Sequence, residues 1–248
     1  TLNFKRKNII LTGFLCLVYT FLFSGEKYVK YGMGYKTYEF TSHNNLIHSG
    51  RYLYGGFSYE FGNQYLNKVQ FQVSNSNREI KLDILYVSAA TAANIRYDFA
   101  IQTVTLNKSS HYFGLHIGND FNLNFFPKID HRNLLWFNQS FTGISLMSKW
   151  KLKKNNRIDF SSHIPIFSTL LYNRLNRLTS EIPGNRSIQS YSGFSNKLLN
   201  ADAEIGYIFS KFGFGWGIYY QVEINRMNET SSTRLTGIAQ SVSLRIIY

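Results

Sequence analysis

A histidine, a serine and a carboxylate near the start of the chain are the first candidates for chemistry. His48 and Ser49 are adjacent, and Glu60 follows them in the next strand-like segment. A serine beside a histidine that a carboxylate orients can act as a nucleophile. Adjacent side chains in an extended strand point to opposite sides, however, so His48 and Ser49 would not meet there. They are weak catalytic candidates, and we expect them to belong to a solvated loop.

Two further pairs have spacings that could suit a metal or acid/base chemistry. His116 and Asp120 share one face of a strand but lie about 13 Å apart, too far for a two-residue metal site. Asp202 and Glu204 also share a face, and we expect an ion-pair network there rather than an acid/base pair. The single cysteine, Cys16, excludes a disulfide framework and a cysteine-based zinc site. The sequence therefore predicts no metal and no cofactor.

The composition favours strands in a polar chain over membrane helices. Hydrophobic residues make up 44% of the 248 residues, and the mean hydropathy is -0.21. The aromatic share of 17%, with 18 Gly and 3 Pro, is typical of pleated strands. The net charge of +13 is scattered along the chain, so we expect no nucleic acid partner. Scattered basic residues suit a surface of anionic lipid instead.

The first residues predict a targeting segment. Lys5-Arg6-Lys7 precede an apolar run over 9–23, which ends at Ser24-Gly25. A basic start, a short apolar core and a small-residue boundary indicate a secretory signal peptide. The alternative is a retained membrane anchor, although the run is shorter than the ~20 residues that a spanning helix needs. We expect a signal peptide over 1–24 and a mature domain over 25–248.

The mature chain shows period-two alternation of apolar and polar residues. The pattern is strongest over 111–125, 199–209, 212–224 and 238–248, which exceed a typical globular strand in length. Weaker strand-like segments cover about 27–40, 51–61, 65–74, 94–106, 134–150 and 156–166. This predicts an all-β fold, an up-and-down antiparallel transmembrane β-barrel of about ten strands. The strand-like segment Ile80 to Val87 either extends the barrel above the membrane or adds a pair and makes twelve strands.

The connections predict which end of the barrel faces outward. Short turns are expected near 62–64, 107–110, 153–156 and 210–211, and longer loops at 41–50, 75–93, 126–133, 167–197 and 227–235. In bacterial barrels the short turns are periplasmic and the long loops lie outside. Loop 167–197 is the longest, and its Leu170, Leu171, Arg174, Leu175, Arg177 and Leu178 predict a short amphipathic helix. A loop of this length suggests a function, and three roles stay open: it folds over the barrel mouth, lies on the anionic outer leaflet, or docks a protein partner.

The end of the chain resembles the C-terminal signature of bacterial outer-membrane β-barrel proteins. The resemblance rests on Val242, Leu244, Ile246 and Tyr248, alternate apolar residues that end in an aromatic. It implies recognition by the barrel-assembly machinery, the outer membrane of a Gram-negative bacterium as the location, and lipid and lipopolysaccharide as neighbours. The Tyr- and Asn-rich composition is similar to that of small barrels from Bacteroidota.

Two families of outer-membrane enzymes have motifs that this chain lacks. Phospholipase A and lipid A deacylase barrels carry a His with a Ser two residues on, and omptin proteases carry Asp-x-Asp and Asp-x-His. None of these strings occurs in the sequence. The question of an enzyme stays open, and the absence of these strings favours a protein that is not one.

The face opposite the lipid-facing side chains carries charges of both signs. We expect a lumen charge network of Lys30, Glu60, Arg96, Asp98, Asp120, Arg157, Asp159, Asp202, Glu204, Glu223 and Arg245, joined by Lys36 and Lys68. Ten strands enclose a narrow lumen, and unpaired buried charges are costly, so the charges should pair and fill it. The expected function is a structural, binding or accessory component. The alternatives are a porin-like small-solute channel and a lipid hydrolase with an atypical site.

Overall fold

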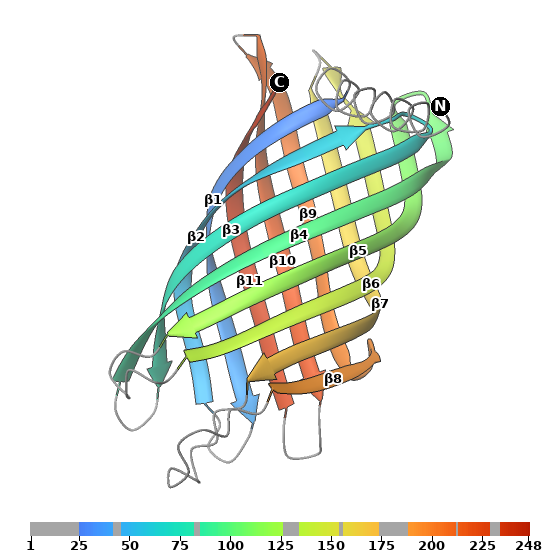
Figure 1. The fold of residues 1–248 in the computed structure, drawn as a ribbon. Helices are drawn as coiled ribbons and strands as arrows, with labels where there is room; N and C mark the ends of the chain where they lie inside the picture. Colours follow the sequence, from blue (N-terminus) through green and yellow to red (C-terminus); the bar gives the residue numbers. More distant parts are fainter. Residues whose placement is uncertain are drawn as a thin grey trace, which may run out of the picture.

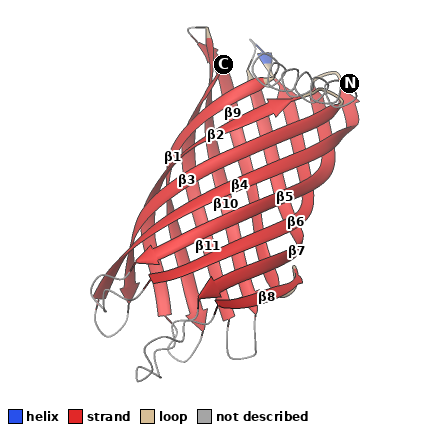
Figure 2. Ribbon diagram, in the orientation of Figure 1, coloured by secondary structure: helices blue, strands red, loops and turns tan. Residues whose placement is uncertain are grey.

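The computed structural model describes residues 25–41, 46–81, 85–125, 134–153, 156–173, 188–211, 213–228 and 234–248. The expected signal peptide over 1–24 lies outside these residues and stays a prediction. Almost all of the described residues lie in strands (Figure 2). Among them, no helix is long and apolar enough to cross a membrane.

Eleven strands follow one another along the described chain (Figure 1). They are β1 (Glu26–Thr41), β2 (Leu46–Phe61), β3 (Tyr65–Lys81), β4 (Leu85–Leu106), β5 (Ser109–Phe125), β6 (Leu134–Lys151), β7 (Arg157–Asn173), β8 (Ile188–Phe194), β9 (Leu198–Lys211), β10 (Phe214–Asn228) and β11 (Arg234–Ile247).

The strands close into one antiparallel barrel. Each strand from β1 to β7 pairs with the next, β9 to β11 do the same, and β1 pairs with β11. The closing pair runs from Tyr28↔Ile247 to Thr41↔Arg234. Beyond it, Lys27 and Tyr248 exchange two backbone hydrogen bonds of 3.1 Å. Strands β8 and β9 both pair with β7, so together they occupy one position in the wall. The predicted up-and-down barrel of ten strands is therefore confirmed.

The two ends of the barrel differ in the length of their connections. The connections between β2 and β3, β4 and β5, β6 and β7, and β9 and β10 span only a few residues. We call this the turn end; β1 starts and β11 finishes there, and the opposite end is the loop end (Figure 1). The segment Ile80 to Val87 belongs to β3 and β4, whose register continues to Lys81↔Leu85. It therefore lengthens an existing hairpin, and the twelve-strand alternative is wrong.

The wall is interrupted where β8 gives way to β9. Strand β7 pairs with β8 up to Phe167↔Phe194 and with β9 from His163↔Asp202 onward. Residues 164–166 of β7 therefore face the longer segment 195–201, in which a turn over 195–197 precedes the first residues of β9. The Ser195 backbone N–H still donates to the Ile166 carbonyl, at 3.0 Å. The turn thus stays attached to the wall while it takes up the extra residues.

The expected loop 167–197 is shorter in the structure. Leu170 and Leu171 lie in β7 rather than in a helix, and they alternate, with Leu170 buried and Leu171 exposed. The sequence reading failed there because an apolar run with serine and threonine nearby suits a strand as well as a helix. Arg174, Leu175, Arg177 and Leu178 lie outside the described residues.

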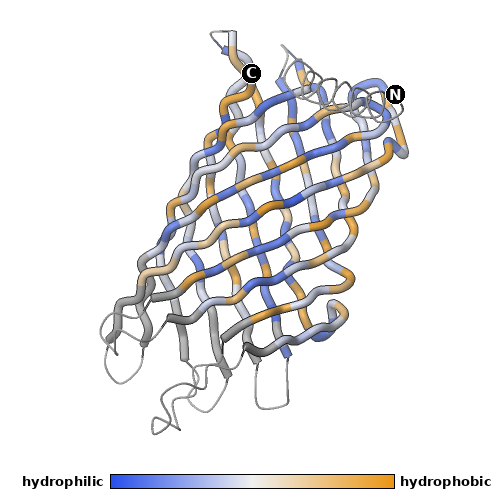
Figure 3. The backbone as a smooth tube through the Cα atoms, viewed as in Figure 1, coloured by the Kyte–Doolittle hydropathy of each residue, from blue (hydrophilic) through white to orange (hydrophobic). Residues whose placement is uncertain are grey.

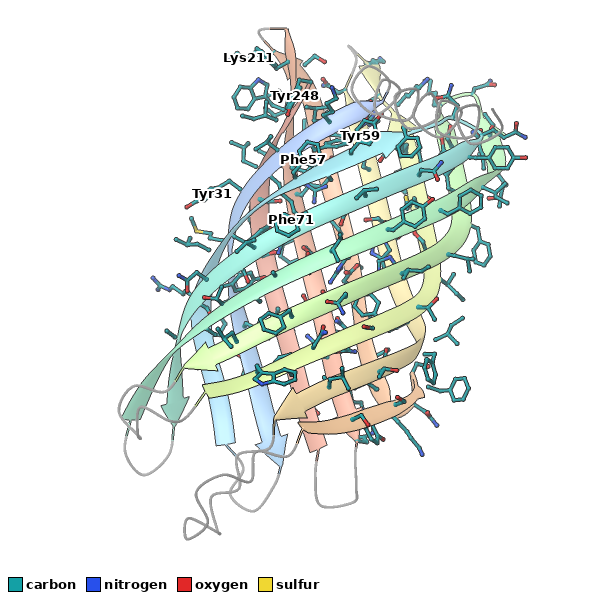
Figure 4. The ribbon with its side chains drawn as sticks, viewed as in Figure 1. Tyr31, Phe57, Tyr59, Phe71, Lys211 and Tyr248 are labelled. Carbon is teal, nitrogen blue, oxygen red and sulfur yellow. The ribbon has the colours of Figure 1, made fainter. Side chains whose placement is uncertain are left out.

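The outer surface carries the apolar side chains that lipid requires. Apolar and polar residues alternate along the strands (Figure 3). Tyr31 projects from the wall and is 60% exposed (Figure 4). Met33, Leu115, Ile117, Ile205 and Val242 are likewise exposed. Because water would penalise such a continuous apolar surface, this exterior is suited to a bilayer.

Candidate functional site: the charged lumen

The structure places the eleven charged residues of the expected network on the inner face. Eight of them are buried; Arg157, Asp159 and Glu223 are partly buried. They do not form one continuous network among the described residues. They divide into a central cluster, an Arg245 layer, a group near the turn end and the pair of Glu223 with Lys36 nearer the loop end.

The central cluster starts with a histidine–aspartate chain that crosses the lumen. His116 Nδ1 of β5 lies 2.6 Å from Asp98 Oδ1 of β4. The same oxygen lies 3.2 Å from His163 Nε2 of β7. His163 Nδ1 in turn lies 2.5 Å from Asp202 Oδ1 of β9. The two imidazole rings stack, with centroids 4.3 Å apart.

The chain continues through a guanidinium to the loop side of the cluster. Arg96 forms an ion pair with Asp202, and its Nη2 lies 3.6 Å from Asp120 Oδ2. Asn200 Nδ2 donates to that Asp120 oxygen at 2.7 Å. The central cluster, defined as Arg96, Asp98, His116, Asp120, His163, Asn200 and Asp202, therefore links β4, β5, β7 and β9 inside the barrel.

A second layer forms around Arg245. Arg245 of β11 pairs with Glu204 of β9, and its guanidinium carbon lies 3.7 Å from the ring centroid of Tyr219. Such a cation over an aromatic face is favourable when water is excluded. Lys30 is 5% exposed, and its Nζ lies 5.9 Å from the Tyr54 ring centroid.

The remaining charges lie toward the two ends. At the turn end, both Arg157 Nη atoms donate to Glu26 at 2.8 Å, and Arg157 Nε lies 2.7 Å from Asp159. Lys149 pairs with Glu60 nearby. Nearer the loop end, Lys36 Nζ lies 3.6 Å from Glu223 Oε1.

Little space remains between these side chains. Two cavities in the lumen each have a volume of about 20 Å³, one lined by Glu60, Tyr219 and Arg245, the other by Arg96 and His163. A third, between Lys36, Asp120 and Glu223, has about 50 Å³. A water molecule needs roughly 10–15 Å³ by this measure, so the two smaller cavities hold one or two waters each and the third holds a few.

The other residue pairs that the sequence singled out have separate surroundings. His116 contacts Asp98, whereas Asp120 contacts Arg96 and Asn200. Asp202 and Glu204 have different partners, so the structure gives them no shared acid/base role. His48 and Ser49 are consecutive in β2, opposite Ile80 and Glu79 of β3; the His48 side chain lies outside the described set, and Ser49 is half-buried.

Sequence reasoning missed several members of these clusters. The expected lumen charge network does not include His163, Tyr219, Glu26 or Lys149. A signal was present for two of them. His163 and Tyr219 follow the alternation of their strands and point to the face opposite Ile164 and Tyr220, which are exposed.

Comparisons with known proteins support the architecture. No protein-family model and no curated protein sequence matches the chain. Among solved structures, the outer membrane protease OmpT from Escherichia coli is similar with a TM-score of 0.53 and 8% identity, covering 91% of this chain and 96% of that one. The translocator domain of the autotransporter NalP from Neisseria meningitidis gives 0.43 and 9%, covering 99% and 97%. The outer membrane protein OprG from Pseudomonas aeruginosa gives 0.36 and 8%, covering 91% and 96%. At 8% identity the likeness to OmpT shows the fold alone, a closed β-barrel of the outer-membrane type.

Proposed function

We propose that this protein is an outer-membrane barrel with a sealed lumen that acts as a structural, binding or accessory component. The observation that carries the proposal is the central cluster, which joins side chains from four strands across the interior. A diffusion pore needs a continuous water path wider than its solute. The lumen cavities hold only a few waters, so they offer no such path.

The arrangement of charges supports a permanent seal. Each central carboxylate faces a cation, a histidine or an amide, and the Arg245 layer forms a second barrier beside it. Separating such buried pairs costs several kcal/mol, because each charge would lose its partner in a poorly hydrated space. This cost exceeds the thermal energy, so both layers stay closed. Any ligand or partner would therefore meet the rim and outer surface rather than the lumen.

Single-channel conductance of the refolded chain in a planar bilayer tests the proposal. We expect no steady conductance from a barrel whose folding is verified by heat-modifiable gel migration. The matched variant replaces Arg96, His163, Asp202, Glu204 and Arg245 with serine, which removes both layers. This variant should conduct, and it shows that the assay detects an open lumen in this same barrel.

Steady conductance from the unchanged protein would contradict the sealed lumen and favour the small-solute channel. Silence from the unchanged protein together with conductance from the serine variant would support the seal. Both results concern the chain by itself, because the refolded protein is measured without any partner.

A further inference from the structure

Three groups that ligate metals converge at the middle of the central cluster. Asp98, His116 and His163 come from β4, β5 and β7, and one ligand atom from each lies within 4.8 Å of the other two. Their side chains are 0%, 1% and 5% exposed. Two imidazoles and one carboxylate form a donor set that suits divalent transition metals such as zinc.

Two atoms of this group lack hydrogen-bond partners. Among the described residues, Asp98 Oδ2 and His163 Nε2 are both buried and make no hydrogen bond. Nε2 is 3.2 Å from Asp98 Oδ1, but the contact does not have hydrogen-bond geometry. A buried polar atom without a partner is costly, and a bound cation would satisfy both atoms at once.

The surroundings of His163 are those of a metal-bound histidine. His163 Nδ1 faces Asp202, so a proton held on Nδ1 leaves the Nε2 lone pair directed toward Asp98. Metal-ligating histidines usually donate their other N–H to a carboxylate in this way, which fixes the ring and its tautomer. Arg96 holds Asp202 in place from the far side.

The net negative charge of the central cluster also favours a bound cation. The central cluster holds three carboxylates, those of Asp98, Asp120 and Asp202, and one guanidinium, that of Arg96. With both histidines neutral, the cluster carries two unbalanced negative charges. One divalent cation would balance them. The competing explanation is protonation of the histidines. One protonated ring leaves one negative charge unbalanced, and two place positive rings 4.3 Å apart.

We propose that Asp98, His116 and His163 bind one divalent transition metal ion of the zinc class inside the lumen. The ion fastens β4, β5 and β7 to one another, and the cavity beside His163 has room for a water as a fourth ligand. The site is enclosed by protein, so the ion enters as the barrel folds. This inference does not depend on whether the lumen conducts.

Zinc retention by the refolded full-length chain tests the site. The chain is refolded with zinc chloride, free metal is removed by gel filtration, and zinc per folded chain is measured by mass spectrometry. We expect about one zinc per chain, the stoichiometry of a single closed site. His116→Gln and His163→Gln should each weaken binding by at least ~10-fold, and Asp202→Asn by ~10–100-fold through the orientation of His163.

His111→Gln is the matched control. His111 lies on β5 with His116, but its ring contacts Ser148 and Ser109 outside the cluster, so its loss should leave zinc retention unchanged. Cobalt gives an independent readout, because its visible spectrum changes when imidazole nitrogens bind. A wild-type barrel that migrates as folded and carries no zinc overturns the proposal. Equal retention by the wild type and both cluster variants overturns it as well.

Discussion

Arg245 of the last strand and Glu204 of β9 form a buried ion pair that bridges β10. Tyr219 of β10 lies on the strand between them, and the Arg245 guanidinium packs over its ring. Two glycines make room for that ring, since a Cβ at Gly206 or Gly217 would lie within 2.5 Å of Tyr219 atoms. The layer thus depends on charge, on an aromatic face and on the absence of two side chains.

The ion pair gives the first prediction. Glu204→Gln leaves the Arg245 guanidinium buried without its carboxylate, and we expect the free energy of unfolding to fall by about 3–5 kcal/mol. The double variant with Glu204→Leu and Arg245→Met should recover most of this loss, because no charge is left unpaired. Urea titration in lipid vesicles measures both. A single variant as stable as the double variant would contradict the account.

Gly206, which lies beside the Tyr219 ring, gives the second prediction. Gly206→Ala places a methyl group 2.2 Å from the Tyr219 ring, so the ring must shift from beneath Arg245. We expect a loss of about 1–3 kcal/mol in the free energy of unfolding, the usual cost of overpacking. Gly55→Ala is the control, because its nearest neighbour atom would lie 3.8 Å away. Equal unfolding midpoints for the two variants would show that the ring has room to move.

The lipid-facing surface gives the third prediction. Leu115 is 59% exposed and lies between the exposed Phe113 and Ile117, whereas Leu106 is 61% exposed and ends β4 at a short turn. An arginine at the bilayer midplane costs about 2–4 kcal/mol, and about 0–1 kcal/mol near the interface. Leu115→Arg should therefore destabilise the barrel in vesicles much more than Leu106→Arg. The reverse order would mean that the membrane lies elsewhere along the barrel.

The terminal aromatic residue, Tyr248, gives the fourth prediction. Tyr248 is 56% exposed, and its backbone bonds to Lys27 do not need the ring. If the resemblance to the C-terminal signature extends to the barrel-assembly machinery, Tyr248→Ala lowers the heat-modifiable barrel in cells but leaves refolding in detergent unchanged. Tyr31→Ala, on the neighbouring strand β1, is the control for loss of an exposed aromatic. Equal losses in cells for the two variants would exclude a signal specific to Tyr248.

Much of the fold was accessible from the sequence because a barrel strand exposes one face to lipid along its whole length. The alternation from Phe113 to Phe125 and from Trp216 to Ile224 reports that environment directly. The positions of the short turns then set the strand count. Strand lengths were underestimated, since β3 and β4 continue beyond the apolar region, where alternation no longer follows the lipid.

The contacts inside the lumen were much less accessible. Asp98 lies opposite His116 only because Thr103 is an extra, unpaired residue in β4. A straight register from the turn at Leu106↔Ser109 would place Asp98 opposite the lipid-facing Ile117. The meeting of Asp98 with His163 depends further on the shear between β4 and β7, which are not neighbours in the sheet. No local pattern in the sequence encodes either the bulge or that shear.

The turn between β8 and β9 has a consequence for how such a chain can vary over evolution. Toward the turn end, residues 202–208 of β9 pair with both β7 and β10, so an insertion there would exchange lipid-facing and lumen-facing side chains. Toward the loop end, β8 pairs with β7 in a register of its own. The hairpin of β7 and β8 can therefore gain or lose residues without disturbing Asp202 or Glu204 of β9. Its sequence is free to diverge while the paired residues 202–208 keep their faces.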